Sequence, residues 1–443
     1  MGFHAHDRQL AGAVLSDRNL EVIFGLRPKT VALWGSMIRA ASGLLIVLVL
    51  GVLALSYAQA ARNTAAVRHL QDFGIFYESA RHVRAGGDMY DVTRLPGADE
   101  TRDHSNLNPP HFHLLVLPFT LLPPGLAFAA WLALSGAALA GSLLLIQRSL
   151  QLGAGAMLAM VGVLVAWAPM FATLLTGQVG PILMLPFTLA WHRARRNRYA
   201  EAGAWIGLCA SVKPFFLLFF VYFALLRQFR AVFAAAGALV AMFVAGIATF
   251  GVAAHRAWID KLATVTWGEH YLNASILGLI ERSFSSAQWP GTPAIDHPWI
   301  ITALWLLVAV PVAIVALVRL RRLQPDRQFL VVTITALLLS PLGWIYYGWF
   351  LLPPLAASCK AGGLTKSGRA LLLLGIGMLG FLVPPPVPWT VLSWREIFST
   401  VTFGSVYSWA LVALWLAAIS IAPSSSGPAV RDVTTSSRAE VVT

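Results

Sequence analysis

The stretch GQVGPILMLPFTLAWHRARRNRYAEAGAWIGLCASVKPFF (residues 177–216) decides the fold, because it places two apolar runs on either side of a strongly basic turn. The runs cover about 180–192 and 201–212, and HRARRNR lies between them. Apolar runs joined by a basic loop are typical of membrane helices whose connection faces the cytoplasm. Each run is shorter than the ~20 residues that cross a bilayer core, so neither helix is expected to span the membrane alone.

The rest of the chain has the same character. Of its 443 residues, 58% are hydrophobic and only 12% are charged, whereas soluble domains are roughly 45–50% apolar. The net charge of +13 fits basic cytoplasmic loops better than nucleic-acid binding. Cys209 and Cys359 both lie in apolar surroundings and have no spacing typical of a disulfide or a metal site. The composition therefore predicts an all-α polytopic membrane protein.

Twelve helical segments account for the apolar runs when the N-terminus is placed inside. The mixed charges before the first run lack the form of a cleavable signal peptide, so this run is expected to be retained as a span. The expected segments are 40–57, 125–147, 152–175, 180–192, 201–212, 214–226, 231–253, 298–318, 328–341, 344–358, 370–386 and 403–422.

Charge divides unevenly between the two sides of this threading. The cytoplasmic side has 21 of the 32 Lys and Arg residues and 7 of the 19 Asp and Glu residues, a net charge of +14. The outer side has the other 11 basic and 12 acidic residues, a net charge of −1. Excess Lys and Arg mark cytoplasmic loops, so the polar loops at about 58–110, 254–297 and 387–402 are expected outside. Merging the short pairs into spans at 201–226 and 328–358 is the alternative and would place 254–297 inside, but prolines interrupt both pairs. The expected regions are a cytoplasmic segment at 1–39, a transmembrane domain at 40–422 and a disordered cytoplasmic tail at 423–443.

Three short motifs interrupt the apolar runs at positions that the threading places near the outer face. They are GQVG (177–180), SVKP (211–214) and SPLGW (340–344). Proline removes a helix hydrogen bond, and broken membrane helices usually line a cavity that satisfies the freed backbone groups. We favour such a cavity, and ordinary packing kinks are the alternative.

Two segments of the first outer loop suit the membrane surface. QDFGIFYESARHVRAGGDMYD (71–91) has aromatic residues at helical spacing and predicts an interfacial amphipathic helix. Asp72 at its start fits a helix cap and a catalytic carboxylate equally well. NLNPPHFHLLVLPFTLLPPG (106–125) is fenced by prolines and predicts a re-entrant or shallow helix. Its His111 and His113 would face different sides of a helix, so we expect no metal site, and no cofactor is expected either.

Lys213 is the only charged residue between Glu201 and Arg227. An ionised group in an apolar stretch is costly and suggests a functional role, so we favour an anionic phosphate as its partner over a lysine that snorkels to the interface. The 270–284 segment offers polar groups suited to reading sugar hydroxyls. We interpret Trp344, Tyr346 and Tyr347 as a lipid-interface aromatic belt, and a platform for sugar is the less favoured alternative.

These stretches in their order resemble glycosyltransferase family 87. The resemblance rests on DFGIFYESARHVRAGGDMYD, NPPHFHLLVLPFTLLPPG, TGQVGPILM, GLCASVKPFF and YLNASILG, which follow one another in this order between residues 72 and 278. The family includes polyprenyl-phosphate-mannose-dependent mannosyltransferases and an arabinofuranosyltransferase. The resemblance implies a GT-C type helical bundle in the bacterial inner membrane, with its active site on the periplasmic or extracellular face. Asn108 stands where family members often have Tyr.

The resemblance also implies a reaction and a set of site residues. A sugar would pass from a polyprenyl-phosphate donor to a lipid or glycan acceptor, with inversion and with Asp72 as general base. Lys213, Arg81, His82 and His270 are expected to bind the donor phosphate. The residues expected to bind sugar or acceptor are Glu78, Asn108, His111, Gln178, Tyr271 and Asn273. A lipid or sugar transporter, or flippase, is an alternative of a different class, although the sequence has no internal repeat, and a non-catalytic assembly partner is a third.

Overall fold

A computed structural model gives the fold of one compact unit, Thr64–Thr443, which contains every residue described below. The predicted first span at 40–57, the segment 1–39, the tail at 423–443 and nearly all of the 387–402 loop lie outside the described residues. The structure describes residues 71–91, 106–165, 167, 173, 176–265, 268–284, 297–380, 401 and 403–420.

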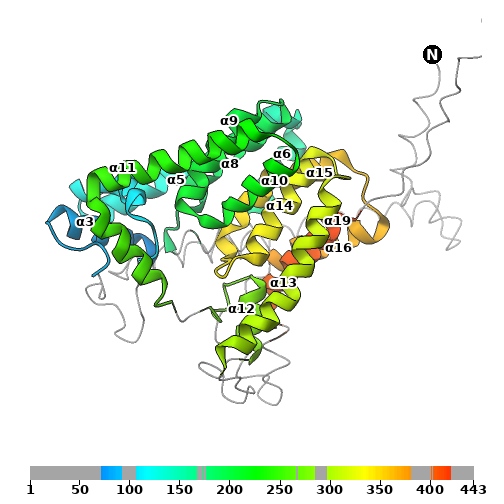
Figure 1. The fold of residues 1–443 in the computed structure, drawn as a ribbon. Helices are drawn as coiled ribbons and strands as arrows, with labels where there is room; N and C mark the ends of the chain where they lie inside the picture. The colour runs from blue at the N-terminus through cyan, green and yellow to red at the C-terminus, as the bar shows by residue number, and fades with distance from the viewer. Residues whose placement is uncertain are drawn as a thin grey trace, which may run out of the picture. The chain divides into compact units, whose positions relative to one another are not determined.

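The described residues form helices and connecting turns and no β-strands, as an all-α membrane protein requires (Figure 1). Within the described ranges, three helices are long and apolar enough to cross a membrane: α5 (Pro124–Leu150), α11 (Phe229–Leu262) and α13 (Pro298–Leu320). They expose large apolar side chains such as Phe233 and Leu307, at 75% and 70% exposure. Apolar side chains on that scale suit contact with lipid, so the predicted fold class is confirmed.

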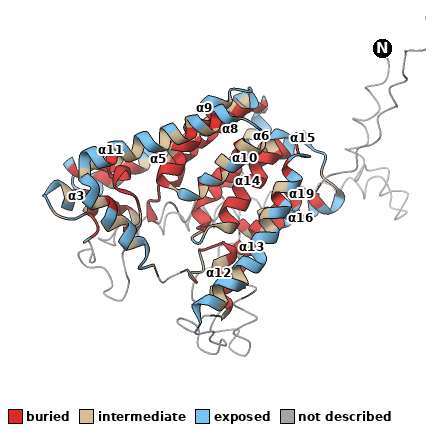
Figure 2. Cartoon of the chain, viewed as in Figure 1, coloured by how far each residue is buried: buried red, intermediate tan, exposed pale blue. Residues whose placement is uncertain are grey.

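Most of the predicted segments correspond to helices whose ends lie within a few residues of the expected positions. Figure 2 shows buried positions concentrated on α8 and α14, between helices with more exposed faces. The helices are α6 (Ala154–Val165), α8 (Gly180–Arg195), α9 (Tyr199–Val212), α10 (Leu218–Leu225), α14 (Pro325–Leu339), α15 (Leu352–Ala361), α16 (Lys366–Leu379) and α19 (Val406–Ile419).

Helix α11 differs from the prediction at its C-terminal end. The outer loop was expected to begin at residue 254, but the helix continues to Leu262 after a kink at Gly251, where φ is +80°. That value lies in the region that favours glycine. The kink allows the last turns of α11 to pack on the Asn106–Asn108 segment, since the Trp258 Nε1 donates a hydrogen bond to the Leu107 carbonyl at 3.1 Å.

Helix α3 (Gln71–Arg84) is the predicted amphipathic helix, but its apolar face packs on protein. Phe73 is fully buried, and its ring centroid lies 5.4 Å from that of Trp131 on α5. Phe76 packs edge to face on Phe112 at 5.0 Å. Phe112 belongs to the proline-fenced segment, which forms three short helical pieces: η2 (Pro110–Phe112), α4 (His113–Val116) and η3 (Leu117–Leu121). The prolines therefore bound a broken helical segment that packs against α3.

Helices α9 and α11 approach each other closely through small residues. A methyl group on Gly203 would overlap the carbonyl of Ala231, and one on Gly207 would overlap that of Ala235. The constant offset between the paired positions shows that the two helices run parallel, side by side (Figure 1). Small residues four apart are the usual means of close helix contact in membranes, a pattern that the sequence contains and that our reading of it missed.

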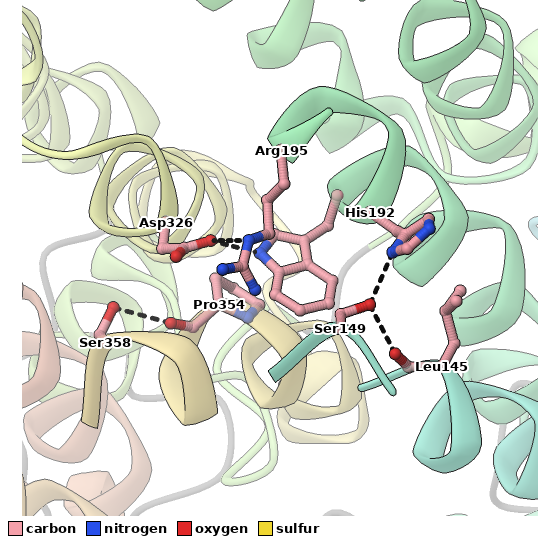
Figure 3. Close-up of polar contacts among 8 residues, drawn as sticks. Leu145, Ser149, His192, Arg195, Asp326, Pro354 and Ser358 are labelled. Atoms are coloured by element: carbon pink, nitrogen blue, oxygen red, sulfur yellow. Dashed lines mark hydrogen bonds and ion pairs between the residues drawn. The ribbon is translucent and has the colours of Figure 1, made fainter. Parts of the chain in front are cut away.

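A polar cluster joins the helix ends farthest from the three helix breaks. The Asp326 Oδ1 accepts a hydrogen bond from Trp191 Nε1 at 2.9 Å and pairs with Arg195 Nε at 3.4 Å (Figure 3). The Ser149 hydroxyl donates to the Leu145 carbonyl at 2.6 Å, so its oxygen accepts from His192 Nδ1, also at 2.6 Å. The cluster holds α5, α8 and α14 together at the end that carries the HRARRNR turn.

The close α9–α11 contact predicts that substituting alanine for two helical glycines, Gly207 and Gly237, has different effects on stability. We expect Gly207→Ala to destabilise the protein by about 1–3 kcal/mol. The added methyl would overlap the backbone carbonyl of Ala235, which cannot move aside as a flexible side chain does. Gly237→Ala is the matched control, since Gly237 is also helical and has nothing near its added methyl. It should leave stability unchanged or slightly raised. Thermal unfolding in detergent measures both, and equal melting temperatures for the two variants would contradict the close contact.

Candidate active site

Each predicted interruption is a real break between helices. Gly177, with φ +67°, precedes α8. Lys213 has extended backbone, with φ −130° and ψ 100°, between α9 and η4 (Pro214–Leu217). Ser340 is also extended, with ψ 136°, and separates α14 from η5 (Ile345–Leu351). The three breaks were located correctly from glycine and proline alone.

A side chain from elsewhere in the fold satisfies one freed carbonyl at each break. Trp131 Nε1 donates to the Gly177 carbonyl at 2.9 Å, and His111 Nε2 donates to the Ser211 carbonyl at 2.7 Å. Asn273 Nδ2 donates to the Pro341 carbonyl at 2.9 Å. Unpaired backbone groups are costly in an apolar environment, so these bonds stabilise the broken conformation.

The breaks meet around Asp72 on the first turn of α3. Asp72 Oδ2 accepts a hydrogen bond from Gln178 Nε2 at 2.5 Å, and Thr176 also bonds its carboxyl. Burial raises the pKa of the Asp72 carboxyl above its usual value, while Gln178, the positive charge of Lys213 and Thr176 oppose that rise. A partly buried carboxylate with a raised pKa is suited to accept a proton.

Lys213 lies within electrostatic reach of Asp72 and is held from two other sides. Its Nζ donates to the Asn108 Oδ1 at 3.1 Å. The same Nζ lies 5.4 Å from the ring centroid of Tyr347, a cation–π distance. The ammonium is therefore fixed in position beside the carboxylate, and its hydrogen-bond donors exceed the one acceptor that Asn108 supplies.

The segment that carries Asn108 is itself clamped. The Tyr90 hydroxyl donates to the Asn108 carbonyl at 2.7 Å, and the Asn108 amide N–H donates to the Asn106 Oδ1 at 3.1 Å. Asn106 in turn donates to His113 Nε2 at 2.9 Å. His111 and His113 thus point to different partners, and the described residues hold no group of three His, Cys, Asp or Glu side chains able to bind a metal.

Three predicted site residues lie farther along α3. Glu78 forms an ion pair with Arg81 at 3.4 Å, and the Arg81 side chain is 60% exposed. His82 is also exposed. Arg81 is nine residues from Asp72, about 13 Å along a helix that rises 1.5 Å per residue. The structure therefore does not bring Arg81 and His82 to the Asp72 carboxylate as it does Lys213.

The remaining predicted residues lie in the 268–284 segment, which contains α12 (Ile276–Phe284). The His270 ring stacks on Tyr271 at 4.6 Å and meets Trp344 edge to face at 5.5 Å. Asn273 is fully buried, and its amide also bonds the Gly268 carbonyl at 2.8 Å and the Gly343 N–H at 2.9 Å. The Asn273 side chain is thus occupied in joining this segment to the third break.

The aromatic residues after that break are buried in the protein. Trp344, Tyr346 and Tyr347 are only 8%, 6% and 5% exposed. Their interpretation as a lipid-interface belt is therefore wrong, because the break turns η5 inward against α8, where Trp349 and the Tyr346 carbonyl both lie 3.0 Å from the Cβ position of Gly180. Tyr346 and Tyr347 lie within electrostatic reach of Asp72. They extend the candidate site towards His270 through Trp344, whose ring stacks on Tyr346 at 5.6 Å.

Reading of the sequence missed two contributors. Thr176 sits one residue before GQVG, and only the fold shows that it reaches Asp72. Arg282 is 1% exposed and donates to the His270 and Asn273 carbonyls at 2.9 and 2.8 Å. A buried arginine of this kind is recognisable only from its partners in the fold.

The chain is similar to known proteins in most of the regions described above. Residues 106–341 match the family model for glycosyltransferase family 87. The polyprenol-phosphate-mannose-dependent alpha-(1-2)-phosphatidylinositol pentamannoside mannosyltransferase of Mycolicibacterium smegmatis is 27% identical over 394 residues, 84% of this chain and 91% of that protein. The protein of the same name from Mycobacterium tuberculosis is 26% identical over 362 residues, 79% of this chain and 78% of that protein. No solved structure matches the chain.

The matched region includes Asn108, Gln178 and Lys213, and it ends within the third break at Pro341. It therefore covers all three helix breaks except the last residues of SPLGW. Because this match extends over more than half of the chain, the protein belongs to glycosyltransferase family 87.

Proposed function

We propose that this glycosyltransferase transfers mannose from a polyprenyl-phosphate donor to a lipid-linked or glycan acceptor at the outer face of the membrane. The observation that carries the proposal is the meeting of Asp72, Gln178 and Lys213 at the three helix breaks. A carboxylate with a raised pKa beside a fixed ammonium suits a reaction that removes a proton from a hydroxyl and releases a phosphate. The names of the two relatives supply the donor sugar and its carrier.

Asp72 acts as the general base in this proposal. Its carboxylate takes the proton of the acceptor hydroxyl while the hydroxyl oxygen attacks the anomeric carbon of the donor. The bond from that carbon to the phosphate oxygen breaks as the new glycosidic bond forms, so the anomeric centre inverts. The proton on Asp72 is then released to water, and the leaving group is polyprenyl phosphate.

Lys213 stabilises that leaving group. Negative charge grows on the phosphate oxygen as its bond to the anomeric carbon breaks, and a pre-positioned cation lowers the energy of this transition state. The hydrogen bond to Asn108 and the ring of Tyr347 hold the ammonium before substrate arrives. His270 is a secondary candidate for the phosphate, because its ring contacts Trp344, which stacks on Tyr346 beside the site. Arg81 and His82 are better placed to meet the acceptor or the membrane surface.

The charges at the two ends of the bundle support an outer position for the candidate site. The described acids at the HRARRNR end, Glu201 and Asp326, are both paired with arginines. Many exposed basic residues remain there, including Arg148, Arg227, Arg319 and Arg321. Excess positive charge marks the cytoplasmic side, so we place Asp72, at the opposite end of α8, on the outer side.

This placement predicts the labelling pattern of two single cysteines in a variant lacking Cys209 and Cys359. Asp91 and Arg196 are both exposed and lie at the outer and the cytoplasmic end of the proposed threading. We expect a membrane-impermeant maleimide to label Asp91→Cys in intact spheroplasts and to label Arg196→Cys only after permeabilisation. The reverse pattern would place the Asp72 end in the cytoplasm.

For Asp72, we expect Asp72→Asn to lower kcat by about 10²- to 10⁴-fold, the usual loss when a positioned base is removed. The asparagine keeps the size of the side chain and an oxygen that can accept from Gln178, so folding should be retained. Glu78→Gln is the control, because the Glu78 carboxylate is paired with Arg81. Purified variants are assayed with polyprenyl-phosphate mannose. Parent-level transfer by Asp72→Asn together with an inactive Glu78→Gln would assign the base to Glu78.

Lys213 is tested through the donor. Lys213→Met should raise the donor KM and lower kcat. Lys213→Arg should change both values less, because it keeps the charge but changes its geometry. Lys366→Met removes an exposed lysine at the opposite end of the bundle and should behave as the parent. Donor titration curves of folded Lys213→Met that superimpose on those of the parent would remove Lys213 from the phosphate site.

A further inference from the structure

Gln178 carries an oxygen with no hydrogen-bond partner among the described residues. The side chain is 8% exposed, and its Nε2 donates to Asp72 Oδ2 at 2.5 Å. Its Oε1 is buried and unpaired. Leaving a buried acceptor unpaired destabilises the protein, so this oxygen is expected to gain a donor in some state of the protein.

Chemistry fixes the orientation of the amide. An ionised carboxylate only accepts hydrogen bonds, so the nitrogen of Gln178 faces Asp72 and the oxygen faces away from it. Both amide atoms are bonded to the same carbon, so Oε1 lies next to the nitrogen that contacts the carboxylate. Gln178 Oε1 therefore lies close to the Asp72 carboxylate. Asp72 already accepts hydrogen bonds from Gln178 and Thr176, whereas Gln178 Oε1 has no donor among the described residues.

The donor that suits both oxygens is a pair of neutral hydroxyls. A cationic ligand is disfavoured, because Lys213 already lies beside Asp72. Neighbouring hydroxyls on a sugar ring present two O–H donors a short distance apart. One hydroxyl would lose its proton to Asp72 and attack, while the other would donate to Gln178.

We infer that Gln178 Oε1 accepts a hydrogen bond from the hydroxyl next to the attacking hydroxyl, so that the acceptor is a sugar with a free vicinal diol at the reacting position. This inference rests on the proposed function, since it takes Asp72 as the base. It makes Gln178 a residue that selects the acceptor. A site built to bond a hydroxyl discriminates strongly against an analogue that lacks it, because the buried oxygen is then left unpaired.

The test measures acceptor binding without donor, so its outcome is independent of sugar transfer. An alkyl α-mannoside and its complete set of mono-deoxy analogues are titrated calorimetrically into the purified full-length protein. For one analogue, we expect binding to the parent to weaken by about 10- to 100-fold relative to the mannoside. In Gln178→Met, the same analogue and the mannoside should bind within about threefold of each other, because the oxygen that distinguished them is absent.

Two further variants control for structure. Gln328→Met removes another buried glutamine, which bonds the Leu320 carbonyl at 2.9 Å far from Asp72, and it should keep the parent's discrimination. Gln178→Asn withdraws the oxygen by one methylene and should lose discrimination even if Gln178→Met does not fold. A residue that merely positions Asp72 would leave the pattern among deoxy analogues unchanged. The inference would be overturned if the Gln178 variants kept the parent's discrimination. It would also be overturned if all analogues bound the parent equally, or if no mannoside bound.

Discussion

The carbonyl groups released at three helix breaks are the constraint on which this structure depends. In an apolar environment each released group needs a partner, and Trp131, His111 and Asn273 supply one partner at each break. Those three side chains come from α5, from the proline-bounded segment at 106–125 and from the 268–284 segment, so satisfying the breaks also assembles these segments around them. Asp72 and Lys213 are neighbours because of this arrangement, although they are far apart in the sequence.

A rigid bundle separates the candidate site from the basic end. Helix α8 runs for 16 residues from Gly180 to Arg195, about 24 Å at 1.5 Å per residue. The close packing of α9 on α11 and the Asp326 cluster fix the distant end. The candidate site therefore lies on irregular backbone that regular helices support, an arrangement that holds a carboxylate and an ammonium close together.

The sequence was sufficient for the helices and their breaks, because apolar length, Gly177, Pro214 and Pro341 act locally. It also predicted roles for Asp72, from the family resemblance, and for Lys213, because it is the only charge in an apolar stretch. Those roles stay predictions. It did not predict the hydrogen-bond partners of the polar side chains. His111 and Asn273 were interpreted as sugar-binding residues from their chemistry, and the structure places their side chains on backbone carbonyls. Trp344 and its neighbours were interpreted as lipid-facing because the inward turn of η5 depends on distant contacts. Such partners are set by tertiary packing.

The most direct test of the central claim is an experimental structure of the protein with a non-hydrolysable polyprenyl-phosphate mannose analogue. We expect a phosphate oxygen to lie about 2.7–3.2 Å from Lys213 Nζ, a normal hydrogen-bond distance. The anomeric carbon should lie beside the Asp72 carboxylate, with room for an acceptor hydroxyl between them. An analogue whose phosphate binds at Arg195 and Arg196, or at any place remote from the three helix breaks, would contradict the account.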